Sequence, residues 1–345
     1  MTLTRRTLFL NSAMAGAMLA APGILRAQGT RQIKLSHYLP PMHQTHLELV
    51  RWADELRATS SGALDIQLFP AGQMGPPPRQ ADLVRTGVAD IAFVYTALNP
   101  GRFPVNDIFA APFVFTGADG EPASAAKASW VATSMRAQIE PEFVDCEHLY
   151  SVLTTNIGFF MKSADIRKPE DLRGLRIRPG SSTVADQITA MGASPANVGP
   201  AELADAIGKG VVDGAMFNFE GGKAFQLQQS VRKVSMISMT AGVFALVANK
   251  AMMDSLPAEL AALIRDTTGP EAGRRVGGLY DAAEAAGREA MVADGVEIVD
   301  LRGDAVKPFQ EALAPVRAAQ LDALRAAGHD PDALLAEIAR LLAEA

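Results

Sequence analysis

The residues with the clearest chemistry lie in the stretch 175–182, Leu-Arg-Ile-Arg-Pro-Gly-Ser-Ser. Its first four residues alternate as a short strand, so that both arginines point away from the core. The strand ends in Arg178, and a predicted helix with a hydroxyl-rich start follows it. An arginine fork can take a carboxylate in two hydrogen bonds, and a helix N-terminus favours anions. The pattern predicts a carboxylate site at Arg178. The competing interpretation is a solvated or ion-paired surface arginine.

Three histidines and one cysteine are the next candidates for chemistry. His37, His43 and His46 lie close in sequence, and a His-x-x-His spacing could supply two zinc ligands. The glutamate of the His-Glu-x-x-His motif is missing, so the alternative is surface histidines flanking a helix start. Cys146 stands alone in a strand-like segment, which favours a buried, inert thiol. The sequence lacks a nucleophile elbow, a P-loop and a dinucleotide fingerprint. We therefore predict no enzyme, no metal and no cofactor.

The composition is that of an ordinary globular protein large enough for about two domains. The chain has 345 residues, 48% hydrophobic and 20% charged, with a formal net charge of -6. Without a basic excess, a nucleic-acid partner has little electrostatic support. One cysteine cannot form an internal disulfide.

Residues 1–27 have the pattern of a signal peptide. Arg5 and Arg6 precede an apolar, alanine-rich run from 13 to 21, and Ala27 follows as a small residue at the cleavage region. The paired arginines favour twin-arginine export, with the general secretory route as the alternative. We therefore expect the mature protein in the periplasm.

The export route is testable because it depends on the two arginines. Changing Arg5 and Arg6 together to lysine should block twin-arginine translocation, which fractionation of cells would show as loss of the periplasmic protein. Normal export of the double variant would favour general secretion.

The elements that must position these residues alternate between strand and helix, which indicates an α/β fold with ligands at the carboxyl ends of parallel strands. Strands are predicted near 33–36, 64–68, 88–95, 143–153, 175–178, 211–217 and 296–301. Helices are predicted near 45–58, 79–86, 124–139, 181–191, 201–207 and 271–292. The last of these is long enough to bridge two domains, although it contains four glycines that weaken a helix.

Several short motifs, in this order, resemble one protein family. They are Ser36-His37-Tyr38-Leu39-Pro40-Pro41, Phe69-Pro70-Ala71-Gly72-Gln73-Met74-Gly75, Gly87-Val88-Ala89-Asp90, Gly101-Arg102-Phe103-Pro104, Asp171-Leu172-Arg173-Gly174-Leu175-Arg176-Ile177-Arg178 and Gly210-Val211-Val212-Asp213-Gly214. With them, residues 31–345 resemble the DctP-type solute receptors of tripartite ATP-independent periplasmic (TRAP) transporters.

The resemblance implies an α/β, two-domain periplasmic binding protein fold, in which each domain is a mostly parallel sheet flanked by helices. Hinge strands and a long bridging helix would join the domains. We expect domain I to comprise 31–155 plus 244–283, and domain II to comprise 156–243 plus 284–345. Closure of the two domains would trap an organic acid.

The resemblance also implies site residues. In the family, the arginine that ends the Leu-x-Ile-Arg strand binds the ligand carboxylate, and it corresponds to Arg178. A second arginine of sialic-acid-type receptors would fall near Gly158 and is absent, and an asparagine of other relatives falls on Phe217. The run from Phe217 through Asn218 to Glu220 resembles a branch with Phe-Pro-Trp-Glu at this place. These differences favour an aromatic or aliphatic monocarboxylate, or a 2-oxo or 2-hydroxy acid, over a sugar acid.

Further ligand-binding candidates are placed by strand ends and by the loops that line the mouth of the family's cleft. Tyr95 ends a buried strand and offers a ring and a hydroxyl, with an ordinary core or rim tyrosine as the alternative. His37 ends the first strand, and Gln73 lies in the loop after the second. Asn156 and Phe159 lie just past the expected crossing between domains.

The sequence therefore predicts a periplasmic receptor that captures a small organic carboxylate and delivers it to the membrane permease of a TRAP transporter. The alternatives are a receptor for another transporter or for a sensor kinase, and a periplasmic enzyme that uses His37 or His43.

Overall fold

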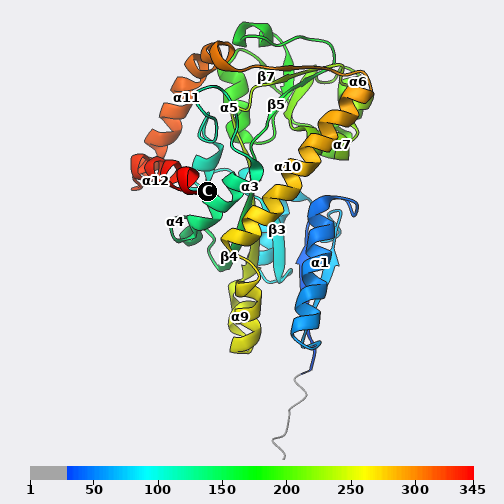
Figure 1. The fold of residues 1–345 in the computed structure, drawn as a ribbon, viewed down its shortest axis with the longest axis vertical. Coiled ribbons are helices and arrows are strands. Elements are labelled where there is room, and N and C mark those ends of the chain that lie inside the picture. The colour runs from blue at the N-terminus through cyan, green and yellow to red at the C-terminus, as the bar shows by residue number, and fades with distance from the viewer. Residues whose placement is uncertain (1–28) are drawn as a thin grey trace, which may run out of the picture.

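The computed structural model describes residues 29–345, so the predicted signal peptide lies outside the described residues. Two β-sheets, each covered by helices on both faces, make up the two halves of the molecule (Figure 1). The predicted α/β architecture of two helix-flanked sheets is confirmed. In residues 29–345, no helix is both long enough and apolar enough to span a membrane.

The first sheet has the strand order β2-β1-β3-β10-β4 and the second the order β11-β9-β5-β8-β6-β7. The strands of the first sheet are β1 (Arg31–Ser36), β2 (Leu64–Phe69), β3 (Ile91–Tyr95), β4 (Cys146–Thr154) and β10 (Gly242–Asn249). Those of the second are β5 (Gly158–Met161), β6 (Arg176–Arg178), β7 (Ser194–Pro195), β8 (Gly214–Phe217), β9 (Lys233–Met236) and β11 (Glu297–Asp300).

The helices pack on the two faces of these sheets. Their bounds are α1 (Gln44–Thr59), α2 (Gln80–Arg85), α3 (Ala125–Ser134), α4 (Arg136–Ile139), α5 (Ser182–Ala190), α6 (Leu203–Gly208), α7 (Phe219–Ala224), α8 (Lys250–Asp254), α9 (Ala258–Asp266), α10 (Pro270–Ala293), α11 (Lys307–Ala326) and α12 (Pro331–Glu344). Short 3-10 turns connect several of them.

Period-two alternation sorts the strand residues between the helix layers. In β3, Ile91 and Phe93 pack toward α1 and α9, whereas Ala92 and Val94 pack toward α2 and α3. Because β3 is buried on both faces, its sequence is a continuous apolar run rather than an alternating one. This explains why a buried strand could be predicted there.

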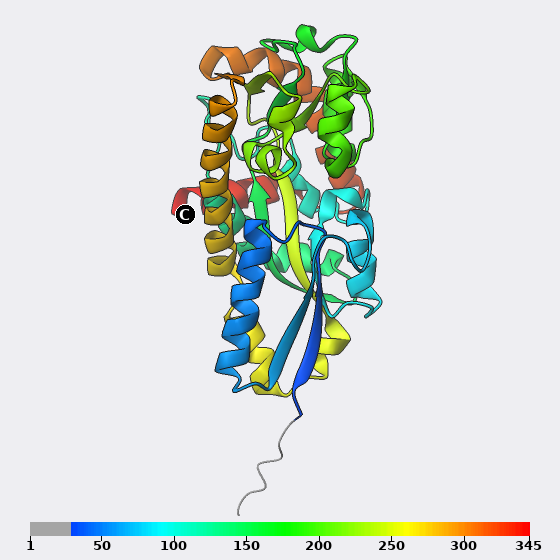
Figure 2. The same cartoon turned by 90° about the vertical axis from the view of Figure 1, so that its right-hand side faces the viewer.

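Each sheet is mostly parallel, as predicted, with one strand that runs against all the others. β10 runs antiparallel to both β3 and β4, and β5 runs antiparallel to both β8 and β9. These strands continue from segments that cross between the halves: 155–157 joins β4 to β5, and 237–241 joins β9 to β10 (Figure 2). A crossing strand enters its sheet from the other half, so it runs against strands that begin within the half.

The long predicted helix is confirmed as α10, and its glycines have a steric reason. A Cβ at Gly277 would lie 2.7 Å from the carbonyl carbon of Ala125, at the start of α3. A Cβ at Gly287 would lie 2.7 Å from the carbonyl carbon of Phe219, at the start of α7. Since α3 belongs to the first half and α7 to the second, these glycines let α10 approach both halves closely (Figure 1).

The C-terminal helix lies outside the predicted second domain. Ile338 and Leu341 of α12, together with Leu324 of α11, pack in one cluster with Ala128 and Val131 of α3. The division assigned 284–345 to domain II. Instead, α12 packs against α3 in the helix layer beside the first sheet, because its apolar face contacts the apolar side chains of α3.

Candidate functional site

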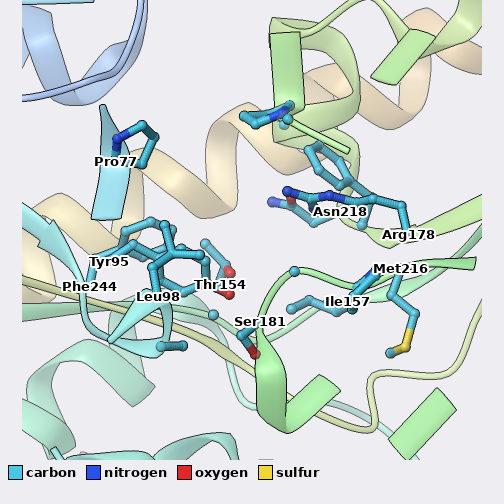
Figure 3. Close-up of a pocket in the computed structure, with 18 of the residues that line it drawn as sticks. Pro77, Tyr95, Leu98, Thr154, Ile157, Arg178, Ser181, Met216, Asn218 and Phe244 are labelled. Carbon is cyan, nitrogen blue, oxygen red and sulfur yellow. The ribbon is translucent and has the colours of Figure 1, made fainter. Parts of the chain in front are cut away.

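A cavity of about 700 Å³ lies where the two sheets face each other. Its walls come from both halves and are mostly aromatic and aliphatic (Figure 3). The side chains that matter for its chemistry are Tyr38, His43, Tyr95, Arg178, Ser181, Phe217, Asn218, Glu220, Phe244 and Tyr280.

Arg178, the last residue of β6, carries the positive charge of the cavity. Its Nε donates to the carbonyl of Val198 at 3.1 Å, and its guanidinium carbon lies 5.4 Å from the centre of the Phe217 ring. Among residues 29–345, no carboxylate oxygen lies within 4.0 Å of a guanidinium nitrogen of Arg178. Burial lowers the pKa of Arg178, because removing the cation from water disfavours its charged form. Within the part of the chain that the structure describes, the guanidinium therefore has no ion-paired carboxylate.

The helix after Arg178 starts at the cavity, as the sequence predicted. Ser181 is the N-cap of α5, and its hydroxyl accepts from the backbone N–H of Val184 at 3.3 Å. Ser181 and Ser182 both line the cavity. The positive end of the helix thus adds to the field of Arg178.

One wall is a stack of aromatic rings from the first half. Tyr95 and Phe244 stack with centroids 4.6 Å apart, and Phe244 and Tyr280 stack at 6.4 Å. In Figure 3 the Arg178 side chain reaches toward the open centre from the side opposite Tyr95 and Phe244. Burial raises the pKa of Tyr95, so its hydroxyl stays protonated and can donate to an anion.

The facing wall is formed by Phe217 at the end of β8. Its ring packs against Phe225 at 6.2 Å and against the buried Phe160 at 6.3 Å, both edge-on. Arg178 lies over the same ring. An aromatic ring bound between the walls would therefore meet apolar surface on both faces and the guanidinium at one edge.

Glu220, in the first turn of α7, connects the halves. Its Oε1 lies 2.7 Å from Nε2 of His43 and accepts from Nε2 of Gln44 at 2.8 Å. Both partners stand at the start of α1 in the first half. Burial raises the pKa of Glu220, but the bonds from His43, Gln44 and Asn218 outweigh it, and the net pKa is below the usual value. Glu220 is therefore an ionised acceptor.

A second carboxylate, Glu284 of α10, ties this region to the crossing segment. It accepts from the backbone N–H groups of Phe219 and Glu220 at 3.1 and 2.8 Å, and from Nδ2 of Asn156 at 3.0 Å. Burial raises the pKa of Glu284 to about 7. The start of α7, the crossing strand and α10 are thus held as one unit.

The structure brings five of the nine predicted ligand-binding residues to this cavity: Tyr95, Arg178, Phe217, Asn218 and Glu220. Four others, His37, Gln73, Asn156 and Phe159, do not line it.

Each of these four has a physical reason to be elsewhere. Phe159 is fully buried against Phe309, because alternation along β5 sends it to the opposite face from Phe160. Asn156 accepts from the Ser238 hydroxyl at 2.8 Å and joins the two crossing segments. Gln73 is exposed to solvent in the turn that follows β2.

His37 is fully buried behind the wall, with Nε2 2.9 Å from Nδ1 of His46. Burial, with the neighbouring His46 and His43, lowers the pKa of His37 to about 3, so it is neutral. His43 is buried too, which corrects the interpretation of the group as surface histidines. In residues 29–345, no three His, Cys, Asp or Glu side chains are grouped to hold a metal ion.

The sequence missed Phe244 and Tyr280 because both lie far from the motifs that point to the cavity. Phe244 is in the crossing strand β10, and Tyr280 is on α10. The sequence does contain one signal for Tyr280. It is an aromatic residue in the middle of a glycine-rich bridging helix, and helix periodicity places it on the same face as Gly273 and Gly277.

The sequence matches the family model described as bacterial extracellular solute-binding protein, family 7 (DctP), over residues 35–322. YiiZ of Salmonella typhimurium strain LT2 is 27% identical over 175 residues, which cover 48% of this chain and 50% of that protein. The match thus spans about half the length of that relative.

Two solved structures are similar over nearly their whole length. A TRAP solute-binding protein from Rhodoferax ferrireducens T118, in complex with copurified benzoate, is 25% identical with a TM-score of 0.83. The match covers 91% of this chain and 98% of that one. A TRAP periplasmic solute-binding protein from Bordetella bronchiseptica with bound (R)- and (S)-mandelate is 25% identical with a TM-score of 0.82, covering 91% and 99%.

Proposed function

Because this chain belongs to family 7 of the bacterial extracellular solute-binding proteins, we propose that it captures a small organic carboxylate between its two sheets. The family and the similar structures are solute-binding receptors rather than enzymes. The receptor delivers its ligand from the periplasm to a TRAP permease and catalyses no reaction.

The observation that carries this proposal is the partly buried Arg178, which lines the cavity without an ion-paired carboxylate in residues 29–345. A ligand carboxylate supplies the missing counter-charge. Their attraction strengthens as closure removes water, because the effective dielectric falls. Ser181 and the hydroxyl of Tyr95 also line the cavity and offer further hydrogen bonds to a carboxylate.

The walls favour an aromatic monocarboxylate as ligand. Tyr95, Phe244 and Phe217 present ring surfaces, whereas a sugar acid would need polar partners along its length. The relatives with benzoate and mandelate support the same class. Arg178, Phe217, Tyr95, Asn218 and Glu220 are the residues we assign to binding.

A thermal-shift screen of organic acids tests this function. Benzoate, phenylacetate and mandelate should raise the melting temperature, since a ligand at 100 times its dissociation constant stabilises the fold by about 2.7 kcal/mol. Glucuronate serves as a matched polar acid and should give a smaller shift. If no carboxylate stabilises the protein, or glucuronate does so most, the assignment fails.

The aromatic wall is tested at Phe217. Phe217→Asn should weaken binding of an aromatic acid by about tenfold, because the polar side chain removes apolar contact of about 1.5 kcal/mol or more. Phe217→Leu is the matched control, and it should bind with intermediate affinity. Calorimetry measures both, and melting of the free variants reports on packing against Phe160. Unchanged affinity in Phe217→Asn would place the ring outside the ligand contact.

Two alternatives share this binding chemistry. A receptor for another transporter, or for a sensor kinase, would bind the same acid, and reconstitution with the permease distinguishes them. An enzyme using His43 has less support, because His43 is bound to Glu220. Turnover of a bound acid by the purified protein would reinstate it.

A further inference from the structure

The two oxygens of Glu220 have different surroundings. Oε1 is occupied by His43 and Gln44, at 2.7 and 2.8 Å. For Oε2, the only hydrogen bond within residues 29–345 is the long one from Nδ2 of Asn218, at 3.5 Å. The side chain is 6% exposed and lines the cavity. One oxygen of a buried carboxylate is thus left under-satisfied beside the ligand space.

An ionised carboxylate can only accept hydrogen bonds. In the open cleft, water can donate to Oε2. When closure expels that water, the ligand must donate in its place, or the oxygen stays buried without a partner. A ligand surface of C–H groups cannot do this, so the site discriminates against acids that carry only a carboxylate.

We propose that Glu220 makes the receptor selective for carboxylates that carry a hydrogen-bond donor in addition, a hydroxyl or an ammonium group. This rests on the proposed function, in which Arg178 takes the ligand carboxylate. Arg178 would bind the carboxylate and Glu220 the donor group of one molecule whose ring lies against Phe217.

The surroundings of Tyr38 support a common ligand space for the two charges. Burial, followed by the neighbouring Tyr95, raises the pKa of Tyr38; Glu220 raises it further and Arg178 opposes them. Both charged groups therefore lie within electrostatic reach of this one hydroxyl, yet they form no ion pair with each other. A ligand placed between them can contact both.

Calorimetry with matched acids tests the proposal. Phenylacetate carries no donor besides its acid group. Mandelate adds a hydroxyl beside the carboxylate, 3-hydroxyphenylacetate adds one on the ring, and phenylglycine adds an ammonium. At least one of these three should bind tenfold or more tightly than phenylacetate, because a site built for a donor rejects the analogue that lacks it. The preferred acid identifies the donor and its position.

Two variants separate selectivity from closure. Glu220→Gln keeps the shape but removes the charged acceptor, so the preference over phenylacetate should fall to about threefold or less. Gln44→Ala removes a contact to Oε1 and leaves Oε2 intact. It should weaken all acids by a similar factor and preserve the preference.

Two results would overturn the inference: phenylacetate binding as tightly as all three donor-bearing acids, or Glu220→Gln weakening every acid equally. The second result would leave Glu220 as a connection between the halves and nothing more. Failure of all four acids and of benzoate to bind would instead contradict the proposed function, and the inference with it.

Discussion

Replacing Arg178 by alanine should weaken the best organic acid by roughly thirty- to several-thousand-fold. The closed cavity would hold a carboxylate without its charged partner, a loss on the order of 2 to 5 kcal/mol. Arg178→Lys should recover only part of this, because an ammonium keeps the charge but loses the two-pronged geometry. Titration calorimetry measures all three proteins.

The free Arg178→Ala protein should melt near the wild-type temperature. The structure pairs this cation with one backbone carbonyl and one ring, so its removal also relieves the cost of burying it. Arg176→Ala is the matched control, because Arg176 lies on the same strand as Arg178 but is exposed and pairs with Asp213 at 3.4 Å. Wild-type affinity in Arg178→Ala would remove the residue from the site, and a collapsed melting temperature would make its role structural.

Placing a methyl group at Gly277 or Gly287 should destabilise the protein by about 1 to 3 kcal/mol each. The new Cβ atoms would overlap the carbonyl oxygens of Ala125 and Phe219, which are backbone atoms and cannot rotate aside. The first variant separates α10 from α3 and the second separates it from α7. Denaturant unfolding monitored by circular dichroism measures the change.

Gly278 provides the control within the same helix. Apart from the backbone of its own helix, no heavy atom lies within 4 Å of a Cβ built there, so Gly278→Ala should stabilise the helix by about 0.5 to 1 kcal/mol. If all three alanine variants behave alike, close packing of α10 against both halves is not what the glycines provide.

The sequence predicted the elements well where local pattern decides them. The strand and cap around Arg178, the buried strand ending in Tyr95 and the long helix α10 follow from alternation, turn residues and helix periodicity. The four glycines weakened the prediction of α10, because propensity counts their cost and ignores their packing against other segments. The resemblance to a family supplied Phe217, Asn218 and Glu220 as candidates.

Contacts between segments that are distant in the chain could not be predicted from the sequence. Phe159 and Phe160 are neighbours in sequence, and only the pairing of β5 decides that Phe159 faces Phe309. His43 and Glu220 are 177 positions apart, so neither histidine spacing nor strand-end logic could join them. The return of α12 to α3 likewise depends on tertiary packing.

The most direct test of the account is a crystal structure of the protein with the tightest aromatic acid from the screen. We expect the carboxylate within about 3 Å of the Arg178 guanidinium, and the ring between Phe217 and the pair Tyr95 and Phe244. An acid bound elsewhere, or bound in this cavity with its carboxylate turned away from Arg178, would contradict the central claim.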